Sequence, residues 1–284
     1  MPNVDVVVIG ASAGGLQALL EIVGDLPPSL PAAILVVVHT PTISTQLPAI
    51  LARETRLAVQ YAEDDAEVLP GRIYVAPPDV HLLVTRSGLT LNYGPRENAF
   101  RPAIDPLCRS AAEAYGARVM GVVLSGALDD GTGGLALIKD AGGVTVVQDP
   151  DEALIPAMPI GAMNYLEVDH VLTAARIGGL IVTSWGSTFN GVPVMARDKS
   201  DVDAGQRDVV EEALWTAVRA LEEHGDLRSR MSRRAGMAGL DQVSGGFADS
   251  ARVAHREAQS IRDLFDDRRA GRPGEANGVA AAEA

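Results

Sequence analysis

The feature that most limits the fold is a series of short apolar runs, each followed by a turn and a segment with helical spacing of apolar residues. Val4 to Ile9 is apolar except for Asp5, and Ala32 to Val38 and Val119 to Leu124 are similar. Runs of this length that are apolar at nearly every position indicate strands buried on both faces, as in parallel sheets. The alternation therefore predicts an α/β fold with a doubly wound, mostly parallel sheet and helices on both faces.

Other segments fit the same alternation. We expect a hairpin between Val80 and Asn92, because two apolar runs flank Ser87-Gly88. A helix is predicted from about Pro102 to Tyr115, with Pro102 in its first turn. Further strands are expected near 57–61, 73–75 and 144–147, and further helices near 16–23, 45–53 and 135–140.

The character of the sequence changes near Ser184. The predicted parts are the α/β domain at 1–183, a linker rich in Ser, Gly, Asp and Pro at 184–204, a helical extension at 205–266 and a disordered tail at 267–284. Within the extension, apolar residues recur at helical spacing, and the expected helices are Asp208–Glu223, Leu227–Met237 and Ala248–Leu264. We expect a small antiparallel appendage or an element for homo-oligomerisation.

Composition excludes several classes of protein. The chain has 24 basic and 37 acidic residues, a net charge of −13, which disfavours nucleic-acid binding. Met1 to Asp5 lacks the basic segment of a signal peptide, and no apolar run is long enough to span a bilayer. The single cysteine, Cys108, can form no internal disulfide. We therefore expect a cytoplasmic protein with no membrane insertion.

The turn after the first strand, Gly10 to Gly15, leads into a helix and has three interpretations. Gly10, Ser12 and Gly14 satisfy the Gly-x-Ser-x-Gly pattern of a nucleophile elbow, in which a sharp turn exposes a serine hydroxyl. A glycine-rich turn before a helix can also cradle the phosphates of a dinucleotide. It can equally be a plain structural turn, and the turn alone does not decide.

The second strand ends in His39, which bears on that choice. A dinucleotide site needs an acidic residue at this point, and no tyrosine is followed by lysine four residues later, as a short-chain dehydrogenase would require. An imidazole is instead the group that takes the proton of a serine nucleophile. If the first two strands are neighbours, Ser12 and His39 meet at the carboxyl edge of the sheet. A histidine that merely ends a strand is the alternative.

A carboxylate to orient the imidazole is expected at the end of another strand. The strand from Val119 is followed by Ser125 to Gly131, which holds Asp129 and Asp130. Either could stabilise a protonated imidazole. The alternative is that both simply cap the next helix, since Asp is a preferred residue at helix starts.

Together these segments resemble the catalytic domain of the chemoreceptor glutamate methylesterases. That family carries a Gly-Ala-Ser-x-Gly-Gly turn, a strand ending in His and a Ser/Thr-Gly-x-x-x-Asp-Gly loop. The resemblance covers about residues 4–180 and extends to three further motifs: Val68-Leu69-Pro70-Gly71-Arg72-Ile73-Tyr74-Val75-Ala76-Pro77-Pro78, Arg101-Pro102-x-x-Asp105 and Gln148-Asp149-Pro150.

The resemblance implies a serine hydrolase with Ser12 as nucleophile, His39 as general base and Asp130 as the orienting carboxylate, so that Asp129 is a loop residue. It places the oxyanion hole at the backbone N–H groups of Ala127 and Ala13. The implied reaction is hydrolysis of glutamate 5-methyl esters on the cytoplasmic helices of chemoreceptors or a similar signalling protein, with deamidation of glutamine as a related activity. No cofactor and no metal are implied.

The sequence departs from the family's usual residues at several positions, which bears on substrate fit more than on the chemistry: Ala13, Thr40, Ala103, Ala127 and Ala157. Regulated members carry an N-terminal phospho-receiver domain, for which a first strand beginning at Val4 leaves no room. We expect an enzyme that is ungated or controlled by its C-terminal helices or a separate protein. The alternatives are a non-catalytic scaffold of the same fold and an esterase with another substrate. His81 is expected to be structural.

Overall fold

The computed structural model describes residues 4–39, 46–184, 204–237 and 241–270. The chain divides into two compact units, one up to Ala220 and one from Leu221, and each is described by itself. Most of the predicted linker and residues 271–284 of the predicted tail lie outside the described residues. The predicted division at 183 and 204 therefore stays a prediction.

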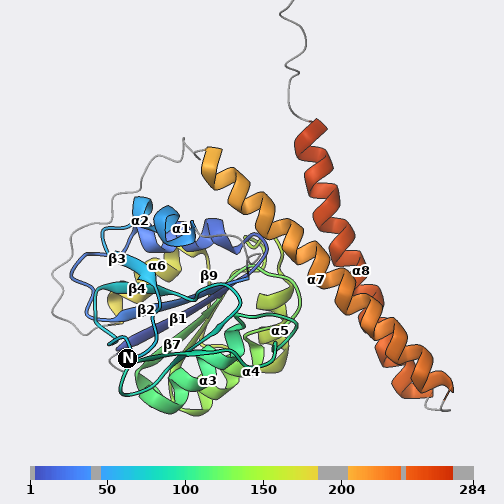
Figure 1. Cartoon of the computed structure of the whole chain (residues 1–284), viewed down its shortest axis with the longest axis horizontal. Coiled ribbons are helices and arrows are strands. Elements are labelled where there is room, and N and C mark those ends of the chain that lie inside the picture. Colours follow the sequence, from blue (N-terminus) through green and yellow to red (C-terminus); the bar gives the residue numbers. More distant parts are fainter. Residues whose placement is uncertain (1–3, 40–45, 185–203, 238–240, 271–284) are drawn as a thin grey trace, which may run out of the picture. The chain divides into compact units, whose positions relative to one another are not determined.

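A seven-stranded sheet forms the centre of the first unit, in the order β3-β4-β2-β1-β7-β8-β9, and every pairing in it is parallel (Figure 1). From β1 the chain winds outward through β2 and then returns to place β7 on the other side of β1. Ligands of such sheets bind at the carboxyl edge where the winding reverses, here between β1 and β7. The strands are β1 Val6–Ala11, β2 Ala33–Val38, β3 Ala58–Tyr61, β4 Arg72–Val75, β7 Val119–Val123, β8 Val144–Gln148 and β9 His170–Leu172.

Helices cover both faces of the sheet, which confirms the predicted doubly wound α/β fold (Figure 1). One core cluster joins the sheet to α1, α2 and α6, and the other joins it to α3, α4, α5 and the β5–β6 hairpin. The elements are α1 Gly15–Gly24, α2 Leu47–Glu54, α3 Ile104–Tyr115, α4 Thr132–Asp140, α5 Ala157–Tyr165, α6 Ala174–Thr183, the short 3-10 helix η1 Gly116–Arg118, and the hairpin strands β5 His81–Val84 and β6 Leu89–Asn92.

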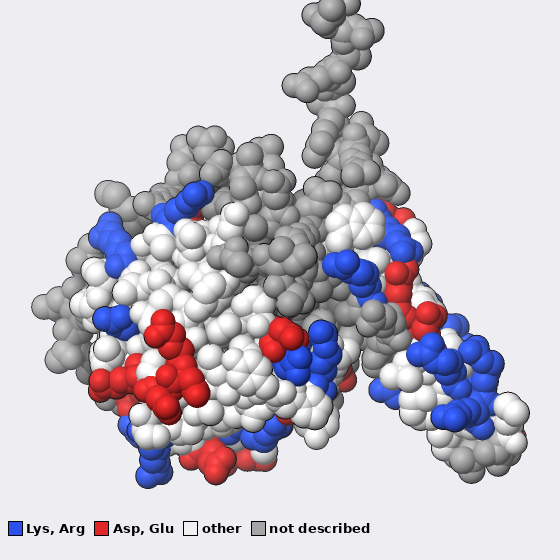
Figure 2. All heavy atoms as spheres, viewed as in Figure 1, with Lys and Arg blue, Asp and Glu red and all other residues white. Residues whose placement is uncertain are grey.

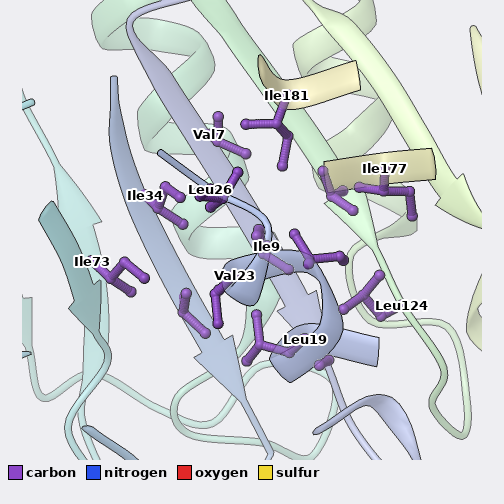
Figure 3. Close-up of a cluster of buried hydrophobic side chains, with 14 of the residues drawn as sticks. Val7, Ile9, Leu19, Val23, Leu26, Ile34, Ile73, Leu124, Ile177 and Ile181 are labelled. Carbon is purple, nitrogen blue, oxygen red and sulfur yellow. The ribbon is translucent and has the colours of Figure 1, made fainter. Parts of the chain in front are cut away.

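The all-apolar strands are explained by this layering. Successive residues of β1 point to opposite faces, so Val7 and Ile9 enter the first cluster while Val6 and Val8 enter the second. Figure 3 shows Val7 and Ile9 packed with Leu19 of α1 and with side chains of α6. Burying each such side chain stabilises the fold by about 1.5–3 kcal/mol.

The helix that was expected to begin at Pro102 begins instead at Ile104. Pro102 precedes it in the loop and is joined to Arg101 by a cis peptide bond. The helix starts where it does because the Asp130 carboxylate accepts the backbone N–H groups of Ile104 and Asp105. The helices α5 and α6 were not anticipated, and α5 has no amphipathic spacing by which to recognise it.

The C-terminal helices are α7, Ala204–Met237, and α8, Asp241–Ala270. The prediction of two separate helices across 208–237 was wrong, because α7 is continuous. Between residues 221 and 270 the two helices run antiparallel, with Ser232 beside Ser244 and Glu222 paired with Arg262. Figure 2 shows Lys and Arg side chains gathered at the end of this pair, where the sequence of α7 carries Arg228, Arg230, Arg233 and Arg234.

None of the described helices is both long enough and apolar enough to cross a lipid bilayer.

Candidate active site

Ser12 and His39 follow neighbouring strands at the carboxyl edge of the sheet. The last residues of β1 and β2, Ala11 and Val38, are partners in the parallel register. The backbone N–H of His39 donates to the carbonyl of Ala11 at 3.0 Å, which fixes the two strand ends side by side. Ser12 and His39 are 1% and 3% exposed, so both lie inside this edge rather than on the surface.

The loop after β7 brings Asp130 to the same edge. Its start is held by the backbone N–H of Ser12, which donates to the carbonyl of Ser125 at 3.0 Å. At its end, Asp130 Oδ2 lies 2.8 Å from His39 Nε2, and the Asp130 side chain is fully buried. Asp129, the neighbouring acid, is exposed. The structure therefore brings together the three residues named from the sequence and separates the two adjacent acids.

Asp130 does not cap the helix that follows it. The residue before α4 is Gly131, and no side chain caps that helix. Asp130 instead lies at the start of α3, where Oδ2 accepts the N–H of Ile104 at 2.7 Å and Oδ1 accepts that of Asp105 at 3.2 Å. A helix N-terminus favours an anion through its free N–H groups and its dipole.

The ionised form of Asp130 is favoured by these contacts. Burial alone would raise the pKa of its carboxyl, but the hydrogen bond and charge of His39 and the donors of Ile104 and Asn98 outweigh it. The pKa of Asp130 is consequently held below its ordinary value. An ionised carboxylate can only accept hydrogen bonds, so His39 Nε2 carries the proton between them.

This assignment leaves the other ring nitrogen of His39 as an acceptor. His39 Nδ1 and Ser12 Oγ are both buried, and neither has a hydrogen-bond partner among the described residues. A neutral imidazole with a proton on Nε2 offers a lone pair at Nδ1, and a serine hydroxyl offers a proton. Two buried groups of complementary type at adjacent strand ends therefore have no partner among the described residues, and a catalytic role is one explanation for such groups in a native structure.

The backbone near Ser12 offers hydrogen-bond donors. The N–H groups of Ala13 and Ala127, the two positions named for an oxyanion hole, donate to no described residue. Both residues are buried. Leu128 has a φ of 67°, a left-handed conformation that costs a non-glycine residue about 1–2 kcal/mol and that shapes the turn after Ala127. Donors of this kind can stabilise a developing negative charge.

Close packing around Ser12 explains why Gly126, in the loop after β7, has no side chain. A Cβ atom on Gly126 would lie 2.0 Å from Met158 Sδ and 2.7 Å from Ser12 Cβ. The Ser125 hydroxyl donates to the carbonyl of Ala13 at 2.8 Å, and Gln148 Oε1 accepts the Ser125 N–H at 2.9 Å. The loops that carry Ser12 and Asp130 are thus fastened directly to each other.

Two residues of the site were not foreseen from the sequence. Phe100 stacks on His39, and the side-chain amide of Asn98 donates to Asp130. Both precede the Arg101-Pro102 motif, so the proximity to that motif was the available signal. The expected structural role of His81 is confirmed, because its ring bonds the Pro95 carbonyl at Nε2 and the Ala103 N–H at Nδ1.

Neither Cys108 nor the potential metal-binding side chains of the described residues form a second centre. Burial raises the pKa of the Cys108 thiol well above its ordinary value, which makes it a poor nucleophile. Among the described residues, no group of three or more His, Cys, Asp or Glu side chains is arranged to hold a metal ion.

Comparison with known proteins decides the family. The sequence matches the family described as CheB methylesterase over residues 7–181, which is more than half of the chain. The chain belongs to this family. The resemblance drawn from the three motifs is therefore confirmed, and so is the assignment to a family of methylesterases.

Relatives in this family carry the same part of the chain. Protein-glutamate methylesterase/protein-glutamine glutaminase 2 of Anaeromyxobacter dehalogenans is 41% identical over 176 residues, which cover 62% of this chain and 52% of the relative. Protein-glutamate methylesterase FrzG of Myxococcus xanthus is 38% identical over 183 residues, covering 64% and 55%. This chain thus spans about half the length of these two relatives.

A solved structure of the family shares the fold. The crystal structure of the Thermotoga maritima CheB methylesterase catalytic domain is 34% identical, with a TM-score of 0.61. The match covers 98% of that chain and 63% of this one. The family's catalytic-domain fold therefore accounts for the α/β unit.

Proposed function

We propose that this protein hydrolyses glutamate 5-methyl esters on the cytoplasmic helices of chemoreceptors, with Ser12 as nucleophile, His39 as general base and Asp130 as the orienting carboxylate. One observation carries the proposal: the buried 2.8 Å bond between His39 and Asp130 beside Ser12, in a member of the CheB methylesterase family. The names of the relatives suggest the substrate class, since both are protein-glutamate methylesterases. Action on a cytoplasmic receptor segment also implies a cytoplasmic protein.

The first half of the reaction makes an acyl-enzyme. His39 Nδ1 takes the proton of the Ser12 hydroxyl, and Oγ attacks the ester carbonyl carbon to give a tetrahedral oxyanion. The N–H groups of Ala13 and Ala127 stabilise that oxyanion, and one such donor contributes about 2.7–4 kcal/mol in hydrolases of this type. The imidazolium then passes its proton to the departing methoxide, which leaves as methanol.

The second half returns the enzyme to its starting state. A water molecule gives a proton to His39 and adds to the acyl carbon, which forms a second tetrahedral oxyanion. Collapse of this intermediate expels the Ser12 oxygen, which recovers its proton from the imidazolium. The sum is one ester and one water converted to one glutamate carboxylate, one methanol and one proton.

The same centre can act on glutamine side chains. The name of the Anaeromyxobacter relative includes protein-glutamine glutaminase. An amide enters the same sequence of steps, except that the leaving nitrogen is protonated and departs as ammonia, where the ester releases methanol. The protonated His39 supplies that proton in either case.

Ser12 is only 1% exposed, so the substrate has to displace the atoms that cover it. A methylated glutamate has a long, unbranched side chain, so it can present its ester to a nucleophile set below the surface. Burial of this kind also excludes bulk water from the oxyanion and strengthens the hydrogen bonds to it.

The test is methanol release from methylated receptor cytoplasmic fragments, comparing wild type with Ser12→Ala and with Ser87→Ala, a control at an exposed hairpin serine. We expect release by wild type and Ser87→Ala and none above background by Ser12→Ala. Labelling with a fluorophosphonate probe is measured in parallel. Labelling of Ser12 without methanol release would reject the proposed substrate but support the assignment as a serine hydrolase. Folded protein that neither labels nor releases methanol would refute the proposal.

A further inference from the structure

The loop between β6 and α3 reaches two members of the proposed active site at once. The ring of Phe100 lies on the ring of His39, with centroids 3.6 Å apart and planes 5° from parallel. Phe100 is 6% exposed, so this stack is part of the interior. One face of the imidazole is therefore held by an apolar wall, and the ring nitrogens at its edge stay available for hydrogen bonds, Nε2 to Asp130 and Nδ1 without a described partner.

Two residues earlier, Asn98 contacts the partner of His39. Its Nδ2 donates to Asp130 Oδ1 at 2.8 Å and to Asp105 Oδ2 at 2.7 Å, so both amide hydrogens are used. The other oxygen of Asp130 accepts His39 Nε2 and the Ile104 N–H. Asn98 thus blocks rotation of the carboxylate away from the imidazole. Its φ of 52° is left-handed, which asparagine tolerates better than most residues.

The loop is fastened independently of the site. The backbones of Glu97 and Phe100 bond each other in both directions, at 3.1 and 2.8 Å. Arg101 pairs with Asp79 at 2.8 Å and donates to the Gly94 carbonyl at 2.8 Å. The contacts of Phe100 and Asn98 are consequently set before any substrate arrives, which is what a preorganised site requires.

We propose that Phe100 and Asn98 are positioning residues that fix the orientation of the His39–Asp130 pair for proton transfer. The inference rests on the proposed function. Asn98 holds Asp130 so that one oxygen meets Nε2, and Phe100 fixes the plane of the ring and with it the position of Nδ1. When His39 takes the serine proton, the resulting cation lies against the face of an aromatic ring, an arrangement that stabilises positive charge.

The stabilisation is specific to the step in which the charge forms. The imidazolium exists only after proton transfer. Losing the contact with the Phe100 ring therefore lowers kcat and leaves KM unchanged. A ring–cation contact of this size corresponds to about a tenfold change in rate. A residue that only packed the loop would instead affect folding or substrate binding.

The experiment compares four variants of the full chain. Phe100→Leu removes the ring, and Phe100→Tyr keeps it. Asn98→Gly removes the amide but suits the left-handed backbone. Tyr93→Leu is the control, because it removes an aromatic side chain that is 75% exposed in the same region.

Three quantities are measured on each variant: kcat and KM for methanol release, the rate of fluorophosphonate labelling, and the proton position on the His39 ring by ¹⁵N–¹H NMR. We expect Phe100→Leu and Asn98→Gly to lose about tenfold in kcat and labelling rate with KM within about twofold. In both variants we also expect the proton of the neutral His39 ring to be no longer confined to Nε2. Phe100→Tyr should retain more activity than Phe100→Leu, because it keeps the ring, and Tyr93→Leu should resemble wild type.

The outcomes separate this inference from the proposed function. Wild type that releases no methanol, while the His39 ring still responds to Phe100→Leu and Asn98→Gly, would reject the substrate and keep the positioning role. A folded Phe100→Leu protein with unchanged kcat, labelling rate and ring protonation would overturn the positioning role, as would a loss confined to KM. If Phe100→Leu does not fold, Asn98→Gly decides by the same criteria.

Discussion

His39 Nε2 and Asp130 Oδ2 are 2.8 Å apart in the interior, although 91 residues separate them in the chain. The sheet makes this contact possible, because β2 and β7 both lie beside β1 and all three end at the same edge. Ser12, His39 and Asp130 thus come from three adjacent strand ends. Their order along the chain, Ser, His, Asp, differs from that of the α/β-hydrolases.

Replacement of Asp130 by Asn should reduce kcat by about four orders of magnitude, because an amide can present its N–H to Nε2 and favour the wrong tautomer of His39. The measurement is the rate of methanol release or of probe hydrolysis. Asp129→Asn is the matched control, since Asp129 is the exposed neighbour. Equal losses in the two variants would show that the loop, and not the carboxylate, is what matters.

The stability of the fold should depend on pH through Asp130 with a definite sign. The pKa of Asp130 in the folded protein is below the ordinary value of 3.8, so its stabilising effect is present above that value and lost as pH falls through the folded pKa. The difference in unfolding free energy between wild type and Asp130→Asn should therefore be larger at pH 6 than at the acid end. Urea unfolding at a series of pH values measures it.

Asp105 should show the opposite slope. Burial, followed by the charge of Asp130, raises its pKa above 3.8, so its favourable contribution is present below 3.8 and lost as pH rises through the folded pKa. Wild type should therefore lose stability relative to Asp105→Asn as pH rises from acid to neutral. Parallel pH dependence in the two variants would contradict the assignment of the two carboxyls.

Gly126→Ala should destabilise the α/β unit by about 1–3 kcal/mol and lower the labelling rate of Ser12, because the new methyl group overlaps Met158 and Ser12. Gly179→Ala is the control. It lies in α6, with nothing within 4 Å of the added Cβ, and should be neutral or slightly stabilising. Unfolding midpoints and labelling rates test both variants. A Gly126→Ala protein as stable and reactive as wild type would show that Met158 can move aside.

A chain that ends after Ser184 should fold and keep Ser12 reactive. The family match ends at residue 181, and the Thermotoga catalytic domain covers the same part of the chain. Circular dichroism and probe labelling of the truncated and full chains provide the comparison. Equal labelling rates would leave the C-terminal helices without an effect on the chemistry, and a changed rate would assign them a gating role.

The strands could be predicted because their signal is local. Val6 to Ile9 and Ala33 to Val38 are apolar at every position, and the first polar residue after each run, Ser12 and His39, directly follows the end of its strand. The pairing of Ser12 with His39 followed once the two strands were taken as neighbours. The choice between Asp129 and Asp130 did not follow from the pattern, because adjacent residues of a loop differ only in which one the backbone turns inward.

The loop contacts could not be predicted, since they have no periodic signal. Asn98 and Phe100 act across to β2, to the β7 loop and to α3, and nothing in the local sequence indicates those distances. The start of α3 was misplaced for the same reason. Pro102 suits a first helical turn, but the acceptor that fixes the start is Asp130, 26 residues from Ile104.

The carboxylate of Asp130 has two roles: it supports the imidazole of His39 and anchors the first turn of α3. Substitutions there are expected to weaken the fold together with the chemistry. A folded but inactive variant is therefore expected more readily at Ser12 than at Asp130. The Ser12 side chain has no hydrogen-bond partner among the described residues, and its loss leaves the helix start intact.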